Sequence, residues 1–135
     1  MRTLAWMLVL LALQGASPLR LLDKGDQSNV DEARQVVVRT AAEWKTLWRR
    51  HSPDRDQPRV DFGRDMVVGA FLGSQATAGF SVEIVSALVE QGVLVVRARE
   101  TRPQVDRIVA QVITSPYHLV AVPRHSGDVR FESVR

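Results

Sequence analysis

The pattern of apolar and polar residues predicts one helix near the start of the domain. Over residues 41–51, apolar side chains recur at three- and four-residue spacing, which places them on one face of a helix. Thr40 and Glu43 have the spacing of a capping box, so the helix is expected to begin there. Trp44 and Trp48 share the apolar face. We expect both to be core anchors that hold the helix on a sheet, rather than an aromatic platform for a ligand.

The remaining apolar segments predict strands. Residues 66–72 are apolar almost throughout, which is typical of a central strand covered on both faces. Residues 80–88 and 93–99 alternate and are joined by Gln91 and Gly92, the pattern of a hairpin. Further strands are expected at residues 35–39, 105–113, 117–122 and 129–131. This order predicts an α+β fold, a single small domain with a mainly antiparallel sheet and one N-terminal amphipathic helix packed on it.

The turn between strands 66–72 and 80–88 contains the first candidates for contact with a partner protein. These candidates are Thr77, Gly79 and Phe80. The small residues of the turn allow unusual backbone conformations, and Phe80 adds an aromatic ring of the kind that often anchors interfaces. Ser115, Pro116 and Tyr117 repeat this combination before a later strand. In the alternative interpretation, these six residues serve the turns and the core only. An unpaired sheet edge is a further candidate surface.

The amino-terminal residues predict export. Arg2, an apolar run over residues 4–13 and small residues up to Ser17 have the layout of a signal peptide, expected over residues 1–17. Cleavage after Ala16 or after Ser17 fits the pattern, and a periplasmic or an extracellular destination fits equally. The polar residues 18–34 predict a flexible leader, and residues 35–135 are expected to form the domain. No transmembrane helix is expected once the signal has been removed.

Composition argues against several functions. The chain has no Cys, which excludes disulfides, thiol nucleophiles, Cys-ligated metals and a lipid-anchored cysteine. The sequence pI of about 10.2 reflects Arg-rich composition, while the formal net charge is only +3. The Arg residues are scattered along the chain, so no nucleic-acid partner is expected.

No motif predicts catalysis. His125, Ser126 and Asp128 are too close in sequence to form a Ser–His–Asp triad unaided, and they fit a polar turn better. His51 is expected at the C-terminal end of the helix, where positive charge suits the helix dipole. The chain has no spacing typical of metal ligands and no phosphate-binding Gly-rich loop. We therefore expect a protein that is not an enzyme, with no metal and no cofactor.

Five segments in order resemble the C-terminal domain of the PrcB family. They are EWKTLW (43–48), VDF (60–62), MVVGAFLG (66–73), TAGFSVEI (77–84) and ITSPYHLVAVP (113–123). The resemblance covers residues 36–131, although Ala78 and Phe80 depart from the Gly and Tyr that the family tends to carry. It implies a non-enzymatic interaction module that associates with or stabilises a secreted protease in bacteria. An exported domain that binds a small ligand or the cell wall, and a hydrolase with unrecognised active-site residues, remain alternatives.

Overall fold

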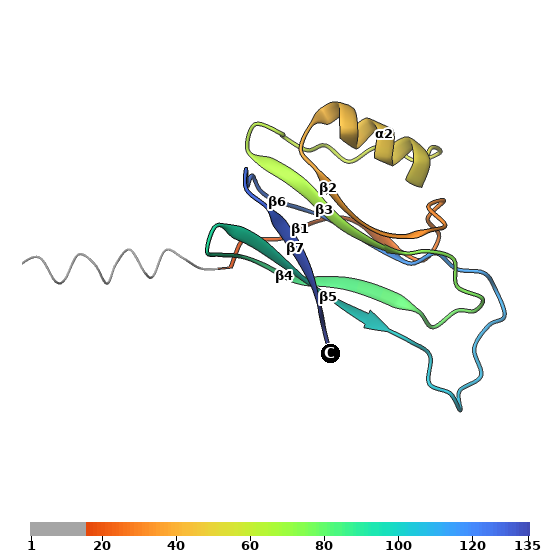
Figure 1. Ribbon diagram of the computed structural model, residues 1–135. Helices are drawn as coiled ribbons and strands as arrows, with labels where there is room; N and C mark the ends of the chain where they lie inside the picture. Colours follow the sequence, from red (N-terminus) through yellow and green to blue (C-terminus); the bar gives the residue numbers. More distant parts are fainter. Residues whose placement is uncertain (1–15) are drawn as a thin grey trace, which may run out of the picture.

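The computed structural model describes residues 16–135 as two facing β-sheets with a helix on one outer face (Figure 1). One sheet has the strand order β1-β6-β3-β2 and the other β4-β5-β7. The elements are β1 (Arg20–Gly25), β2 (Ala33–Val38), α2 (Ala41–His51), β3 (Asp65–Leu72), β4 (Ser81–Glu90), β5 (Val93–Thr101), β6 (Tyr117–Pro123) and β7 (Val129–Val134).

The strand β3 is the central strand that its apolar composition predicts. It pairs antiparallel with β2 on one side and β6 on the other, and its six inner residues are buried. Because side chains alternate across a strand, β3 supplies two separate cores. Val67 and Phe71 pack in the core beneath α2, whereas Met66 and Val68 pack in the core between the sheets.

The helix α2 begins and packs as its sequence predicts. The Thr40 side chain accepts a hydrogen bond from the Glu43 backbone N–H at 3.2 Å, which caps the first turn. Trp44 and Trp48 are buried in the core beneath the helix. Their indole N–H groups donate to the backbone carbonyls of Pro58 and Arg55, each at 2.9 Å. Both are therefore core anchors, and no exposed aromatic platform exists on this helix face.

The second sheet combines both strand directions. The hairpin β4–β5 is antiparallel and turns at Gln91 and Gly92, which have φ angles of 51° and 80°. The strand β7 then pairs parallel with β5. The expected α+β class with mainly antiparallel pairing is thus observed, but the strands form two sheets rather than one, and β1 and β2 precede the helix.

The expected flexible leader over residues 18–34 is wrong. This segment contains β1, which pairs antiparallel with β6, and Val30, which is completely buried. Its polar residues mislead because β1 is an edge strand whose Leu22 alone packs against the core beneath α2. Residues 1–15, which carry most of the expected signal peptide, lie outside the described residues.

The strand expected over residues 105–113 is also absent. Residues 102–113 form a loop, the cyan-to-blue segment at the lower right of Figure 1. Four of their apolar side chains, Val105, Ile108, Val112 and Ile113, are exposed to solvent, because no neighbouring strand among the described residues pairs with this segment. Within residues 16–135, no helix is long and apolar enough to cross a membrane.

Candidate functional site

The turn 73–80 and the loop 102–114 together form one end of the molecule, which we call the tip. Gln75 and Thr114 exchange two backbone hydrogen bonds, at 2.7 and 3.0 Å. The Ala78 N–H donates to the Ala110 carbonyl at 3.0 Å, and the Thr114 hydroxyl donates to the Thr77 carbonyl at 2.9 Å. Segments far apart in sequence are thereby held as one unit.

The three candidates in the turn lie on this tip. Thr77 and Phe80 are half-buried, and Gly79 is exposed with a φ angle of 95°. A Cβ atom at position 79 would lie 2.8 Å from Cβ of Pro103, so glycine is needed both for its backbone angle and for the close approach of the loop. Gly79 therefore has the structural role in the turn that the alternative interpretation predicts. The same residue also shapes the exposed surface of the tip.

The loop side of the tip carries four apolar side chains in water. Relative to a fully exposed residue, Val105 is 106% exposed, Ile108 104%, Ile113 73% and Val112 51%. Single exposed apolar residues are ordinary, but four within nine positions of one loop are not. Such a gathering is typical of a surface that is covered by a partner. Their apolar pattern predicts a strand, whereas the structure leaves all four side chains exposed in a loop.

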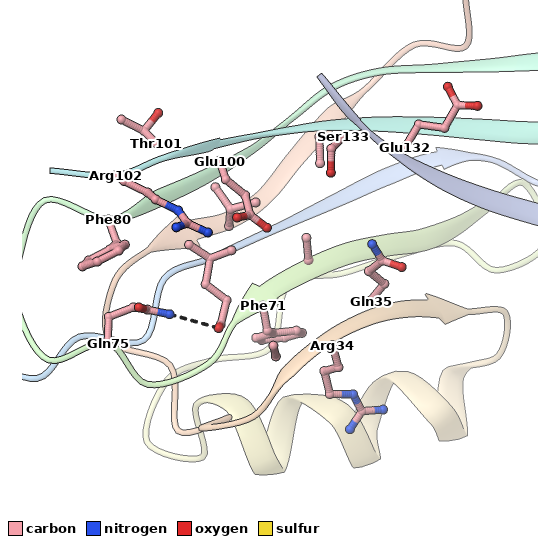
Figure 2. A pocket seen from close by; sticks show the side chains of 15 residues that line it. Arg34, Gln35, Phe71, Gln75, Phe80, Glu100, Thr101, Arg102, Glu132 and Ser133 are labelled. Atoms are coloured by element: carbon pink, nitrogen blue, oxygen red, sulfur yellow. Dashed lines mark hydrogen bonds between the residues drawn. The ribbon is translucent and has the colours of Figure 1, made fainter. Parts of the chain in front are cut away.

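A cavity of about 660 Å³ opens between the two sheets beside the tip (Figure 2). Phe80 forms an apolar part of its lining, while Glu100 and Arg102 supply opposite charges from β5 and the loop that follows it. The Gln75 side chain donates to the Leu72 carbonyl at 3.2 Å, the dashed line in Figure 2. The cavity is a polar cleft with an apolar floor, continuous with the surface.

Ser115, Pro116 and Tyr117 lie beneath the tip and are buried, so the prediction that they contact a partner is wrong. The Ser115 hydroxyl donates to the Val30 carbonyl at 3.0 Å and fixes the amino-terminal segment. The Tyr117 ring lies 4.3 Å, centroid to centroid, from that of His51. Burial raises the pKa of Tyr117 to about 12, and the neighbouring Asp23 carboxylate adds to the rise. These three residues serve the core, as the alternative interpretation held.

A buried polar cluster that sequence reasoning missed joins Asp23, His51 and Ser28. The Ser28 hydroxyl lies 2.7 Å from Nδ1 of His51, and Nε2 of His51 lies 2.8 Å from Oδ2 of Asp23. Arg55 binds the same carboxylate. Burial lowers the pKa of His51 despite the opposing Asp23 carboxylate. Burial by itself raises the pKa of Asp23, but hydrogen bonds from Arg55 and His51 outweigh it, so the net pKa is lowered.

These three side chains have the composition of a serine-hydrolase triad but not its accessibility. The His51 ring is completely buried, and Ser28 also accepts the Val30 N–H at 3.0 Å. A nucleophile has to reach a substrate carbonyl, which this packing prevents. The cluster instead fastens the amino-terminal segment to the end of α2. Burial also lowers the pKa of His51, which opposes the expected role as a cation at the helix end.

The other histidines also have structural partners. Nδ1 of His118 accepts the Ile84 N–H at 2.8 Å and so joins the two sheets. Nε2 of His125 lies 2.9 Å from the Gly92 carbonyl, in a turn as its sequence predicts. Within the described residues, no group of three or more His, Asp or Glu side chains is placed to hold a metal ion.

Comparison with known protein families gives a match over the central part of the chain. The family model described as PrcB C-terminal matches residues 66–123, from β3 through β6, and this span includes the whole tip. Neither the curated proteins nor the solved structures include a match to the chain.

Proposed function

We propose that the chain, whose residues 66–123 match the PrcB C-terminal family, is an exported, non-enzymatic interaction module that associates with a secreted protease complex. The family assignment supports the association with a protease complex. The observation that carries protein binding is the exposed apolar surface of the tip.

The tip has the properties that a protein contact surface requires. The apolar side chains of Val105 and Ile108 are exposed to water in the free protein. Burying a side chain of this size against a partner contributes about 1.5–3 kcal/mol to the free energy of association. The loop is tied to the turn 73–80 by four hydrogen bonds that involve Gln75, Ala78, Thr77 and the loop backbone or Thr114. A surface that is ordered before binding loses less conformational entropy on association.

Export is the second part of the proposal. It is supported by the sequence of residues 1–17, which has the charge, apolar run and small residues of a signal peptide. Amino-terminal sequencing of the mature protein from the exported fraction tests it directly. A mature chain that begins at Ser17 or Pro18 is expected, and recovery of intact residues 1–17 in the cytoplasm would contradict export.

The protein partner is tested by affinity purification from the native exported fraction, with mass spectrometry as the readout. The wild-type chain should recover a secreted protease. The double variant Val105→Ser and Ile108→Ser should recover at least about tenfold less, because its contact surface has lost two hot-spot side chains. Its melting temperature should be unchanged, since both side chains are solvent-exposed in the free protein.

Val89→Ser is the matched control, because Val89 is also an exposed apolar residue but lies on β4 outside the tip. It should bind like the wild type. Equal recovery by all three proteins would remove the tip from the interface. Recovery of glycan without protein would support the alternative of a cell-wall-binding domain.

A further inference from the structure

The strand β2 has a free edge, and we infer that this edge accepts an extended peptide segment from a protein partner as an additional strand. The four edge strands of the two sheets are β1, β2, β4 and β7. A free edge presents unpaired backbone N–H and C=O groups, and an extended peptide matches them.

The pairing of β3 with its two neighbours shows which backbone groups of β2 point away from the sheet. The Leu72 N–H donates to the Pro116 carbonyl, so even-numbered residues of β3 bond toward β6 and odd-numbered residues toward β2. Phe71 and Gly69 pair with Arg34 and Val36, which therefore bond inward. The N–H and C=O groups of Gln35 and Val37 point away from β3. Among the described residues, no backbone group outside the ladder bonds to them.

Two cavities flank this edge, one on each face of β2. A groove of about 650 Å³ lies between β2 and α2, lined by residues 34–38 of the strand and by Ala42 and Leu47 of the helix. The cleft between the sheets lies on the other face and includes Gln35. Figure 2 shows Arg34 and Gln35 on opposite sides of the strand, toward the helix and toward the cleft.

This arrangement fits an extended segment better than a helix or a compact ligand. Successive side chains of a strand point to opposite faces, so a strand added beside β2 would fill both cavities in alternation. The helix-side groove runs along five residues of β2, or about 17 Å at the rise of a strand. The helix wall of the groove carries Glu43, Thr46 and Arg50 beside Ala42 and Leu47, so it suits side chains with an apolar stem and a polar end. Polar side chains suit the cleft, where Glu132 and Ser133 also lie.

The other edges are blunted more strongly than that of β2, although β2 also carries Arg34, which pairs with Glu32 at 3.6 Å. The strands β1 and β4 carry register shifts, and Ser17 donates to the Ala87 carbonyl of β4 at 2.8 Å. The strand β7 bears Arg130 and Glu132, paired at 3.1 Å. Bulges and charges of this kind prevent strand addition. The ladder of β2 runs from Ala33 to Val38 without a register shift and ends in three valines.

The inference rests on the proposed function in that the occupant belongs to a protein, but it uses a surface separate from the exposed side chains of the tip.

The probe is a set of random heptapeptides displayed on phage and selected on the purified protein lacking residues 1–17. The selected sequence is then synthesised. Its binding should slow hydrogen exchange of the Gln35 and Val37 amides by at least about tenfold, because these become strand hydrogen bonds.

Gln35→Pro and Gln35→Ala form the decisive pair of variants. Proline removes the outward N–H and no inward ladder bond, whereas alanine keeps that N–H. We expect Gln35→Pro to weaken peptide binding at least tenfold and Gln35→Ala less than threefold, with both circular dichroism spectra native. Equal affinities for the two variants, protection confined to other strands, or failure to enrich any peptide would each overturn the inference.

A third protein separates this inference from the proposed function. The double variant Val105→Ser and Ile108→Ser should bind the selected peptide with wild-type affinity. If it instead loses the peptide while Gln35→Pro retains it, the tip is the peptide site and the β2 inference fails alone. If Gln35→Pro loses the peptide while no protease is recovered from the exported fraction, the proposed protease association fails alone.

Discussion

At the residue scale, single glycines decide how close the segments of the tip approach one another. Gly79 and Gly92 both have φ angles in the left-handed region, 95° and 80°. Their surroundings differ, because Pro103 would lie 2.8 Å from a Cβ at position 79, while nothing lies within 4 Å of a Cβ at position 92. A side chain at position 92 would therefore meet backbone strain alone, whereas a side chain at position 79 would meet both backbone strain and a steric clash.

This difference predicts unequal effects of alanine substitution. Gly92→Ala should cost about 1–2 kcal/mol of the free energy of unfolding, from the left-handed backbone alone. Gly79→Ala should cost at least 1 kcal/mol more, because the loop must also move to remove an overlap. Urea unfolding of both variants measures the costs. Equal losses would show that Pro103 and the loop yield freely to the added methyl group.

At the element scale, β1 completes the domain although its composition resembles a leader. It covers the outer edge of β6, places Leu22 against the core beneath α2, and brings Asp23 to the buried ring of His51. Its contribution therefore combines strand pairing, apolar burial and a polar cluster. None of these three contributions is local in sequence.

Removal of β1 should be strongly destabilising. A chain that begins at Asp26 lacks Asp23 and leaves the buried Nε2 of His51 without its hydrogen-bond partner, a change that costs about 1–3 kcal/mol in addition to the lost strand pairing. A chain that begins at Pro18 retains β1 and is the control. Thermal unfolding should show a cooperative transition for the control and a much lower or absent transition for the truncated chain. Equal transitions would show that residues 18–25 are dispensable for folding.

At the scale of the whole molecule, buried histidines hold the parts together. His51 fastens the amino-terminal segment to α2, and His118 joins the two sheets through the Ile84 N–H. Burial lowers the pKa of both below the ordinary value of 6.5; near His118, Lys24 lowers it further and Glu83 opposes the change. The unfolded chain therefore binds more protons than the folded one once the pH falls below 6.5.

The free energy of unfolding should thus decrease as the pH falls from 6.5 toward 5, by at most about 1.4 kcal/mol per pH unit for each histidine. The Asp23 carboxyl, whose pKa is lowered, loses its stabilising contribution only below its ordinary value of 3.8. His118→Asn keeps an acceptor for the Ile84 N–H without a titrating ring, so it should halve the slope. Urea unfolding at pH 7.5, 6.5 and 5.5 measures it, and an unchanged slope in the variant would contradict this assignment.

The sequence by itself determined the elements whose signals are local. The Thr40 cap, the buried tryptophans of α2, the apolar strand β3 and the β4–β5 turn follow from spacing and composition within a few residues. The ordered motifs also predicted the resemblance to the PrcB C-terminal family, and the match of that family over residues 66–123 confirms it. Short-range periodicity suffices for these features because each depends on neighbours along the chain.

Only the tertiary structure decided which segments meet. The polar residues 20–25 became a strand because β6 offers them an edge, and the apolar residues 105–113 remained a loop because no strand lies beside them. Asp23, Ser28 and His51 converge from separate segments, and Tyr117 is buried rather than exposed. Pairing and burial depend on partners distant in sequence, and no local pattern of residues encodes those partners.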